Sequence, residues 1–155
     1  MSESILTKIK RWGFNFYPVY RRTGARIGYI DDSWREIRIS IPLRFWTRNY
    51  YGTISGISMF GGVDPIYMVM LIKLLGPQYL VWDKQATSRF IKPGKNKLSA
   101  RFVIDDAELD LIRSKLEAEP SVTRTYHIDL VDTEGIVCAS VDKVIHIRKR
   151  QDKNK

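Results

Sequence analysis

Apolar side chains recur at helical spacing near the start of the chain, in residues 4–17. Four of them are separated by four, three and four residues: Ile5, Ile9, Trp12 and Phe16. This spacing puts all four on one face of an amphipathic helix, and Pro18 then ends the pattern. We expect an N-terminal helix whose apolar face packs against the rest of the protein.

The next two segments have the alternation of apolar and polar residues that is typical of half-buried strands. The first covers residues 24–30, and the second covers residues 35–43, where isoleucines alternate with polar side chains. Asp31, Asp32 and Ser33 lie between them and favour a turn. The pattern predicts an antiparallel hairpin with one buried and one solvated face.

Residues 54–75 are apolar on almost every side of a helix, and a helix without a polar face must be enclosed by protein or by lipid. The length approaches that of a membrane span. However, Asp64-Pro65 and Lys73 would be costly in hydrocarbon. We therefore expect a central helix enclosed by a sheet, not a membrane span.

The rest of the chain predicts more strands and one further helix. That helix begins after Asp105 and has Leu109, Ile112 and Leu116 on one face. The predicted strands cover residues 79–91, 98–104, 123–131 and 136–148. Several strands around a single buried helix indicate an α+β fold with an antiparallel sheet.

Composition limits the function classes. The chain has 155 residues, of which 44% are hydrophobic, enough for one compact domain that we place at residues 1–150. Its single cysteine, Cys138, excludes a disulfide framework within the chain and a cysteine-based zinc site. Lysines and an arginine interrupt the apolar pattern of the first twenty residues, which therefore do not resemble a signal peptide. We expect a cytoplasmic protein that uses no metal and no redox cofactor.

The formal net charge of +9 is concentrated in part at the C-terminus, where residues 148–155 hold five basic residues and one acidic residue. Residues 151–155 are predicted to be a disordered basic tail, with a phosphate- or membrane-binding arm as the alternative. The remaining charge is ordinary for a soluble domain. No stacking motif of the RNA-binding kind accompanies it, so nucleic acid is not an expected partner.

A motif at the start of the central apolar segment resembles a known family. It is Arg48-Asn49-Tyr50-Tyr51-Gly52-Thr53-Ile54-Ser55-Gly56-Ile57 followed by Gly62-Val63-Asp64. The motif resembles the hotdog thioesterases related to phenylacetyl-CoA thioesterase, whose pattern is Asn-x-x-Gly-x-x-His-Gly-Gly and then an acid on the central helix. The lead-in and the segment Trp82-Asp83-Lys84 are especially similar to an uncharacterised branch, a domain of unknown function. The resemblance implies an antiparallel sheet of five or six strands wrapped around one central helix.

One departure from the family pattern concerns the chemistry. Ser55 stands where the family has its histidine, and the only two histidines, His127 and His146, lie in predicted C-terminal strands. The resemblance implies an acyl-CoA thioesterase that acts on acyl-CoA or another acyl thioester. Loss of the histidine leaves an alternative, a hotdog protein that binds acyl chains or acyl thioesters without hydrolysing them.

The resemblance also assigns roles. Asp64 would be the nucleophile or general base, Asn49 would orient substrate or water, and Ser55 would take a hydrogen-bonding role in place of the histidine. The backbone of Gly56 and Ile57 would stabilise an oxyanion at the helix start. Each side chain also has a structural alternative: Asp64 before Pro65 and Ser55 are typical helix caps, and Asn49 is a typical turn residue.

Three further residues are candidates for substrate binding: Asp83, Arg89 and Lys92. Arg89 and Lys92, together with Lys95 and Lys97, could meet the phosphates of coenzyme A, or they could simply be solvated side chains of a turn and a strand end. Asp83 and Lys84 project from opposite faces of one strand, so one of them needs a buried partner or a partner subunit. Because hotdog sites form between subunits, the resemblance implies a homodimer, with a homotetramer as a larger alternative.

Overall fold

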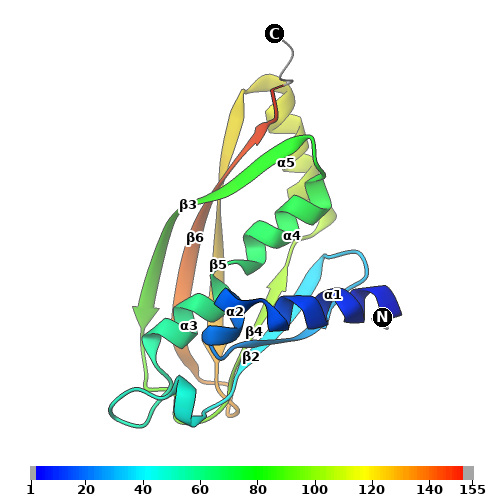
Figure 1. Cartoon of the computed structure of the whole chain (residues 1–155). Helices are drawn as coiled ribbons and strands as arrows, with labels where there is room; N and C mark the ends of the chain where they lie inside the picture. Colours follow the sequence, from blue (N-terminus) through cyan, green and yellow to red (C-terminus); the bar gives the residue numbers. More distant parts are fainter. Residues whose placement is uncertain (1–2, 152–155) are drawn as a thin grey trace.

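One antiparallel sheet of six strands, in the order β1-β2-β4-β5-β6-β3, forms the framework of the protein (Figure 1). The structure is a computed structural model that describes residues 3–151. The predicted disordered tail, residues 151–155, therefore lies almost entirely outside the described residues. The strands are β1 (Arg26–Ile30), β2 (Glu36–Ile41), β3 (Tyr79–Phe90), β4 (Leu98–Val103), β5 (Ser121–Val131) and β6 (Val137–Lys149).

The first two strands form the predicted hairpin. In β2 the side chains of Ile37, Ile39 and Ile41 are buried, while the residues between them are not. β1 and β2 pair in antiparallel fashion, and β2 continues onto β4 with Ile37 opposite Phe102. The period-two pattern thus sets which face of the sheet becomes the core.

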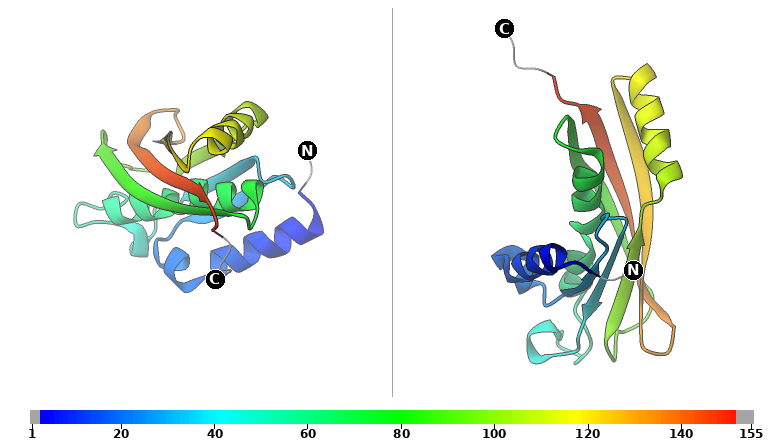
Figure 2. Two further views of the ribbon diagram at one scale, coloured as in Figure 1. Left: turned by 90° about the horizontal axis from the view of Figure 1, so that it is seen from above. Right: turned by 90° about the vertical axis from the view of Figure 1, so that its right-hand side faces the viewer.

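The apolar central segment forms two helices, α3 (Gly56–Val63) and α4 (Ile66–Leu75), which lie on the inner side of the curved sheet (Figure 2). By length and composition alone, Gly56–Leu75 could cross a membrane. Here, however, Ile66, Met70 and Leu71 are fully buried in the core of the sheet. The predicted central helix enclosed by an antiparallel sheet is therefore confirmed.

The N-terminal helix α1 (Ile5–Phe16) forms where it was predicted, but its apolar face points to solvent and not toward the protein. Ile5, Ile9, Trp12 and Phe16 are all exposed, and the buried side chain is Thr7. Figure 2 shows α1 as the outermost helix on its side of the sheet. The expectation that the apolar face of α1 packs on the protein is wrong. The opposite face packs there, because its polar side chains form hydrogen bonds with β1.

Those bonds attach α1 to the free edge of β1. The side chain of Asn15 donates to the carbonyl of Ile27 (2.9 Å) and accepts from its N–H (2.8 Å). Glu3 accepts from the N–H of Ile30 and forms an ion pair with Arg11. An unpaired strand edge is a site for unwanted association, and α1 closes this one.

Helix α5 (Asp106–Ala118) is the predicted insertion between β4 and β5. Asp105 caps it by accepting from the N–H of Glu108 (2.8 Å), and its apolar face is buried as predicted. Glu108 also binds Arg124 through two bonds, of 2.8 and 2.7 Å, which attach the helix to β5. Two short helices complete the chain, α2 (Pro18–Arg22) and the 3-10 helix η1 (Phe45–Thr47).

Candidate functional site

The start of α3 is the first part of the site. Ser55 is the N-cap: its hydroxyl oxygen accepts from the N–H of Ser58 (3.3 Å), and the hydroxyl donates to the Ser58 side chain (3.2 Å). Ser55 therefore acts as a helix cap. The N–H groups of Gly56 and Ile57 in the first turn have no hydrogen-bond partner within residues 3–151. Such free groups at a helix N-terminus attract negative charge.

A cleft of about 720 Å³ lies over this helix start. It brings together three of the predicted site residues, Asn49, Gly56 and Lys92. Ile54, Met59 and Phe90 form apolar walls, and Lys95 adds a second cation to the lining. A cleft with apolar walls, free backbone N–H groups and lysines has the elements needed for an acyl group attached to a phosphorylated carrier.

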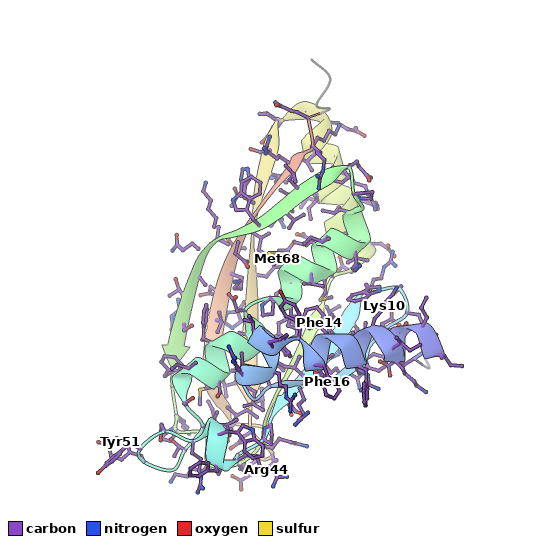
Figure 3. The ribbon with its side chains drawn as sticks, viewed as in Figure 1. Lys10, Phe14, Phe16, Arg44, Tyr51 and Met68 are labelled. Atoms are coloured by element: carbon purple, nitrogen blue, oxygen red, sulfur yellow. The ribbon has the colours of Figure 1, made fainter. Side chains whose placement is uncertain are left out.

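Asn49 organises the loop beside this cleft. Its side-chain oxygen accepts from the N–H groups of Tyr51 (3.0 Å) and Thr53 (3.1 Å), and its side-chain nitrogen donates to the Thr53 hydroxyl (2.9 Å). Gly52 adopts a φ of +80°, which suits glycine, and Tyr51 extends from the loop tip (Figure 3). The carboxamide of Asn49 is thus used in the turn.

Gly56 allows a close approach between the helix start and the ring of Phe90. A Cβ at this position would lie 2.9 Å from the Phe90 Cζ atom, closer than a carbon–carbon contact permits. The ring, which is exposed, would have to move within the cleft.

If the cleft binds the acyl-CoA substrate proposed below, Gly56→Ala should raise the KM for it by displacing the Phe90 ring, with unfolding free energy within about 1 kcal/mol of wild type. Steady-state kinetics and urea unfolding measure the two effects. Adding Phe90→Ala to the variant removes the clash and should restore part of the lost affinity. A KM unchanged by Gly56→Ala would contradict this function of the glycine.

Asp64 lies at the break between α3 and α4, with its side chain partly exposed. It does not cap α4, whose first residues have no side-chain cap. Instead, its Oδ1 lies 2.5 Å from Nζ of Lys143. The capping alternative for Asp64 is therefore wrong, and the carboxylate is available on its exposed side.

Lys143 is the residue that sequence reasoning missed. It lies on β6 with 1% of its side chain exposed, and its Nζ is also 3.0 Å from Oδ1 of Asp83. Burial raises the pKa of Asp83 above its usual value, although Lys143 opposes the rise. A signal was present in the sequence: Lys143 shares its alternation with the inward residues Val141 and Ile145. The structure thus gives Asp83 the buried partner that its position required.

The two parts of the site are far apart within one chain. Asp64 follows the last residue of α3, a helix of 8 residues that begins at Gly56. At 1.5 Å per residue, its backbone is about 12 Å from the free N–H groups. A single carbonyl group of a ligand cannot contact both parts of the same chain.

Arg89 lies away from both parts of the site. It forms an ion pair with Asp142 (2.7 Å), and Asp142 alternates with Lys143 along β6, so its side chain points to the outer face of the sheet. Asp142 and Asp129 also contact the two ring nitrogens of His127, at 2.6 and 2.9 Å.

The pKa values of the two histidines should lie on opposite sides of the usual histidine pKa. The hydrogen bond to Asp142 raises the pKa of His127, whereas burial and the nearby Lys84 and Arg148 lower the pKa of His146. A raised histidine pKa stabilises the fold below the unfolded-state value of about 6.5, and this contribution is lost as pH rises through the folded-state pKa. An NMR titration of the imidazole signals, assigned with His127→Gln and His146→Gln, measures the pKa of each histidine. Equal titration midpoints for the two histidines would contradict the prediction.

Within residues 3–151, no group of three or more His, Cys, Asp or Glu side chains is placed to hold a metal ion. The charged groups of the candidate site are the two lysines of the cleft and the Asp64–Lys143–Asp83 cluster.

Residues 8–147 match the family model described as a domain of unknown function (DUF4442). The chain belongs to this family. The expected relationship to an uncharacterised branch is thereby confirmed. Among curated proteins, none matches the DUF4442 chain.

Solved structures show what the DUF4442 chain is similar to. A protein of unknown function from Pseudomonas aeruginosa, described as a probable thioesterase, superposes with a TM-score of 0.82 at 16% identity, covering 93% of this chain and 96% of that one. A protein of unknown function from Chlorobaculum tepidum gives a TM-score of 0.73 at 16% identity, covering 94% and 95%. A thioesterase from Haemophilus influenzae gives 0.67 at 12% identity, covering 100% and 96%. Identities this low show the fold alone, and the hotdog fold is confirmed.

Proposed function

We propose that this protein hydrolyses acyl-CoA or a related acyl thioester, in a site formed between two copies of the chain. The observation that carries the proposal is the partly exposed Asp64 carboxylate on the central helix, held by the buried Lys143 at 2.5 Å. The similarity in fold to a thioesterase from Haemophilus influenzae supports it.

The reaction requires an oxyanion site and a base. The thioester carbonyl accepts hydrogen bonds from the free N–H groups of Gly56 and Ile57, so that negative charge developing on its oxygen is stabilised. Asp64 takes a proton from water while the water oxygen attacks the carbonyl carbon. When the carbon–sulfur bond breaks, the thiolate leaves and receives that proton, which gives a carboxylic acid and free coenzyme A.

The cleft supplies the binding part of this proposal. Ile54, Met59 and Phe90 would contact the acyl group near the reacting carbonyl. Lys92 and Lys95 would pair with the phosphates of coenzyme A. Arg89 has no part in it because its guanidinium already pairs with Asp142 on the outer face.

A dimer through β3 would bring Asp64 of one copy to the helix start of the other. The β1 edge of the sheet is closed by Asn15 of α1, whereas β3 is the edge strand at the opposite end of the sheet. Asp83 lies on β3, and Asp64 reaches the same cluster through Lys143. Antiparallel pairing of two β3 strands across a two-fold axis would join the two sheets. Each of the two resulting sites would then combine Asp64 of one copy with the start of α3 of the other.

The test is release of free thiol from a panel of acyl-CoA substrates, followed with a thiol reagent. Turnover of at least one member above the uncatalysed rate supports the proposal. Sedimentation velocity on the same preparation should give a dimer or a larger assembly.

A second candidate function has one observation in its favour. The Ser55 hydroxyl, which stands in place of the family's histidine, is occupied in capping α3. A site without that histidine could bind acyl thioesters without hydrolysing them. Calorimetric binding of an acyl-CoA with no thiol release from any member of the panel would favour this candidate and reject hydrolysis.

A further inference from the structure

The outer face of α1 is a stripe of apolar side chains that is not buried by the rest of the described chain. Ile5, Ile9, Trp12 and Phe16 are each at least half exposed, and the rings of Trp12 and Phe16 lie 4.5 Å apart. Figure 3 shows Phe14 and Phe16 on opposite sides of the helix, so that Phe14 faces the core and Phe16 faces away. Apolar residues that are exposed singly and scattered over a surface need no explanation, whereas a contiguous apolar face indicates a binding surface.

The apolar surface continues beyond α1. A cleft of about 690 Å³ separates α1 and α2 from η1, and both Phe16 and Trp46 line it. Three arginines line the same cleft: Arg21, Arg22 and Arg26. The guanidinium of Arg21 lies over the Phe16 ring, 5.6 Å from its centre. Two aromatic side chains and three arginines therefore line the same cleft.

The charged side chains that α1 and α2 themselves carry are all positive. At 3.6 residues per turn, Lys8 lies beside the apolar stripe, whereas Lys10 lies on the protein-facing side, with its Nζ over the Trp34 ring. Residues 4–22 contain five basic residues and no acidic one. Two carboxylates that contact α1 are already engaged, Glu3 with Arg11 and Asp32 with the hydroxyl of Thr7. The surface thus combines an apolar strip with flanking cations.

We propose that this surface, made of the outer face of α1 together with α2 and Trp46, binds the surface of a bilayer that contains anionic phospholipids. Helices that lie in a membrane interface have this composition, with Trp, Phe and Ile entering the acyl boundary and Lys or Arg at the headgroups. Anionic headgroups complement Lys8, Arg21 and Arg22. A second copy of the chain would bring the same cations against each other, on a protein whose net charge is +9.

The experiment is cosedimentation of the full chain with vesicles. We expect binding to vesicles of equal parts phosphatidylcholine and phosphatidylglycerol, weak binding to phosphatidylcholine alone, and weaker binding at high salt because screening reduces the charge term. Failure of the wild-type chain to bind the anionic vesicles would overturn the proposal. Thioester turnover is measured separately, so loss of lipid binding and loss of catalysis can be told apart.

Variants locate the surface. Ile9→Ser with Trp12→Ser should weaken binding to anionic vesicles about tenfold or more, and Lys8→Gln with Arg22→Gln about fivefold for each charge removed. Leu111→Ser, an exposed apolar residue on α5, and Lys97→Gln are the matched controls and should bind like wild type. Circular dichroism and urea unfolding verify that each variant is folded.

Two outcomes would contradict the assignment. Binding that survives both double variants would place lipid binding elsewhere on the chain. The second outcome is a smaller assembly of the Ile9→Ser, Trp12→Ser variant than of the wild-type chain in sedimentation velocity without lipid. A second copy of the chain would then cover the stripe, and the bilayer would not.

Discussion

Replacing Asp64 with asparagine should lower thioester turnover by about 10²–10⁴-fold, the usual contribution of a positioned general base. Asparagine keeps the size of the side chain and an oxygen that accepts from Lys143, whose second partner Asp83 remains. We therefore expect the variant to fold, with unfolding free energy within about 1 kcal/mol of wild type. Thiol release at saturating acyl-CoA measures the change in kcat.

The control for this experiment is Asp129→Asn, which makes the same chemical change on the outer face of the sheet beside His127. It should leave turnover near the wild-type rate. Equal turnover by Asp64→Asn and wild type would remove Asp64 from the mechanism. The free N–H groups at the start of α3 could then still bind a thioester, but hydrolysis would need another base.

Prediction from the sequence works best where the pattern of burial is unambiguous. The segment from residue 54 to residue 75 has no polar face, so only an enclosing sheet or a bilayer could accommodate it. Alternation along residues 35–43 and 136–148 set the faces of β2 and β6, and the observed strands begin and end within two residues of the predicted bounds. These features depend on period and composition, which are local properties of the chain.

The orientation of α1 could not be predicted in this way. Periodicity shows that Ile9 and Trp12 share a face, but it does not show which face meets the protein. The orientation is decided by Asn15, which bonds to both backbone groups of Ile27, and by Thr7, whose hydroxyl donates to Asp32. Such partners are distant in sequence, and only the fold identifies them.

The candidate site, like the fold, could be predicted only in part. The motif spacing located the helix start and Asp64, and the alternation of the strand required that Asp83 or Lys84 have a partner. The identity of that partner could not be inferred because Lys143 is distant from both acids in the sequence and a lysine is usually exposed. Its exposed fraction of 1% depends on the pairing of β3 with β6, which places Asp83 opposite Ile145 on the inward face.

Lys143→Met should be the most destabilising single change in the site. Removing one member of a buried ion pair typically costs 3–5 kcal/mol. Because the Asp64 side chain is partly exposed, we expect a smaller loss of about 2–3 kcal/mol in the free energy of unfolding. Methionine keeps most of the side-chain volume, so the loss reports the two carboxylates left without a cation. Urea unfolding at fixed protein concentration measures it.

The pH dependence separates this electrostatic cause from poor packing. Without Lys143, the pKa of Asp83 should rise further, since the lysine is what opposes the effect of burial. A carboxyl whose folded-state pKa is raised binds its proton more tightly in the folded protein, so stability falls as pH rises through that range. The deficit of Lys143→Met should therefore be largest at neutral pH, shrink in acid, and be reduced by adding Asp83→Asn.

Lys149→Met is the matched control because Lys149 is exposed at the end of the same strand. It should change the free energy of unfolding by no more than about 0.5 kcal/mol at any pH tested. A deficit of Lys143→Met that is the same at acid and neutral pH, and that Asp83→Asn does not reduce, would assign Lys143 a packing role. In that case the ammonium would not be what positions Asp64 for catalysis, and the proposed base would need a different support.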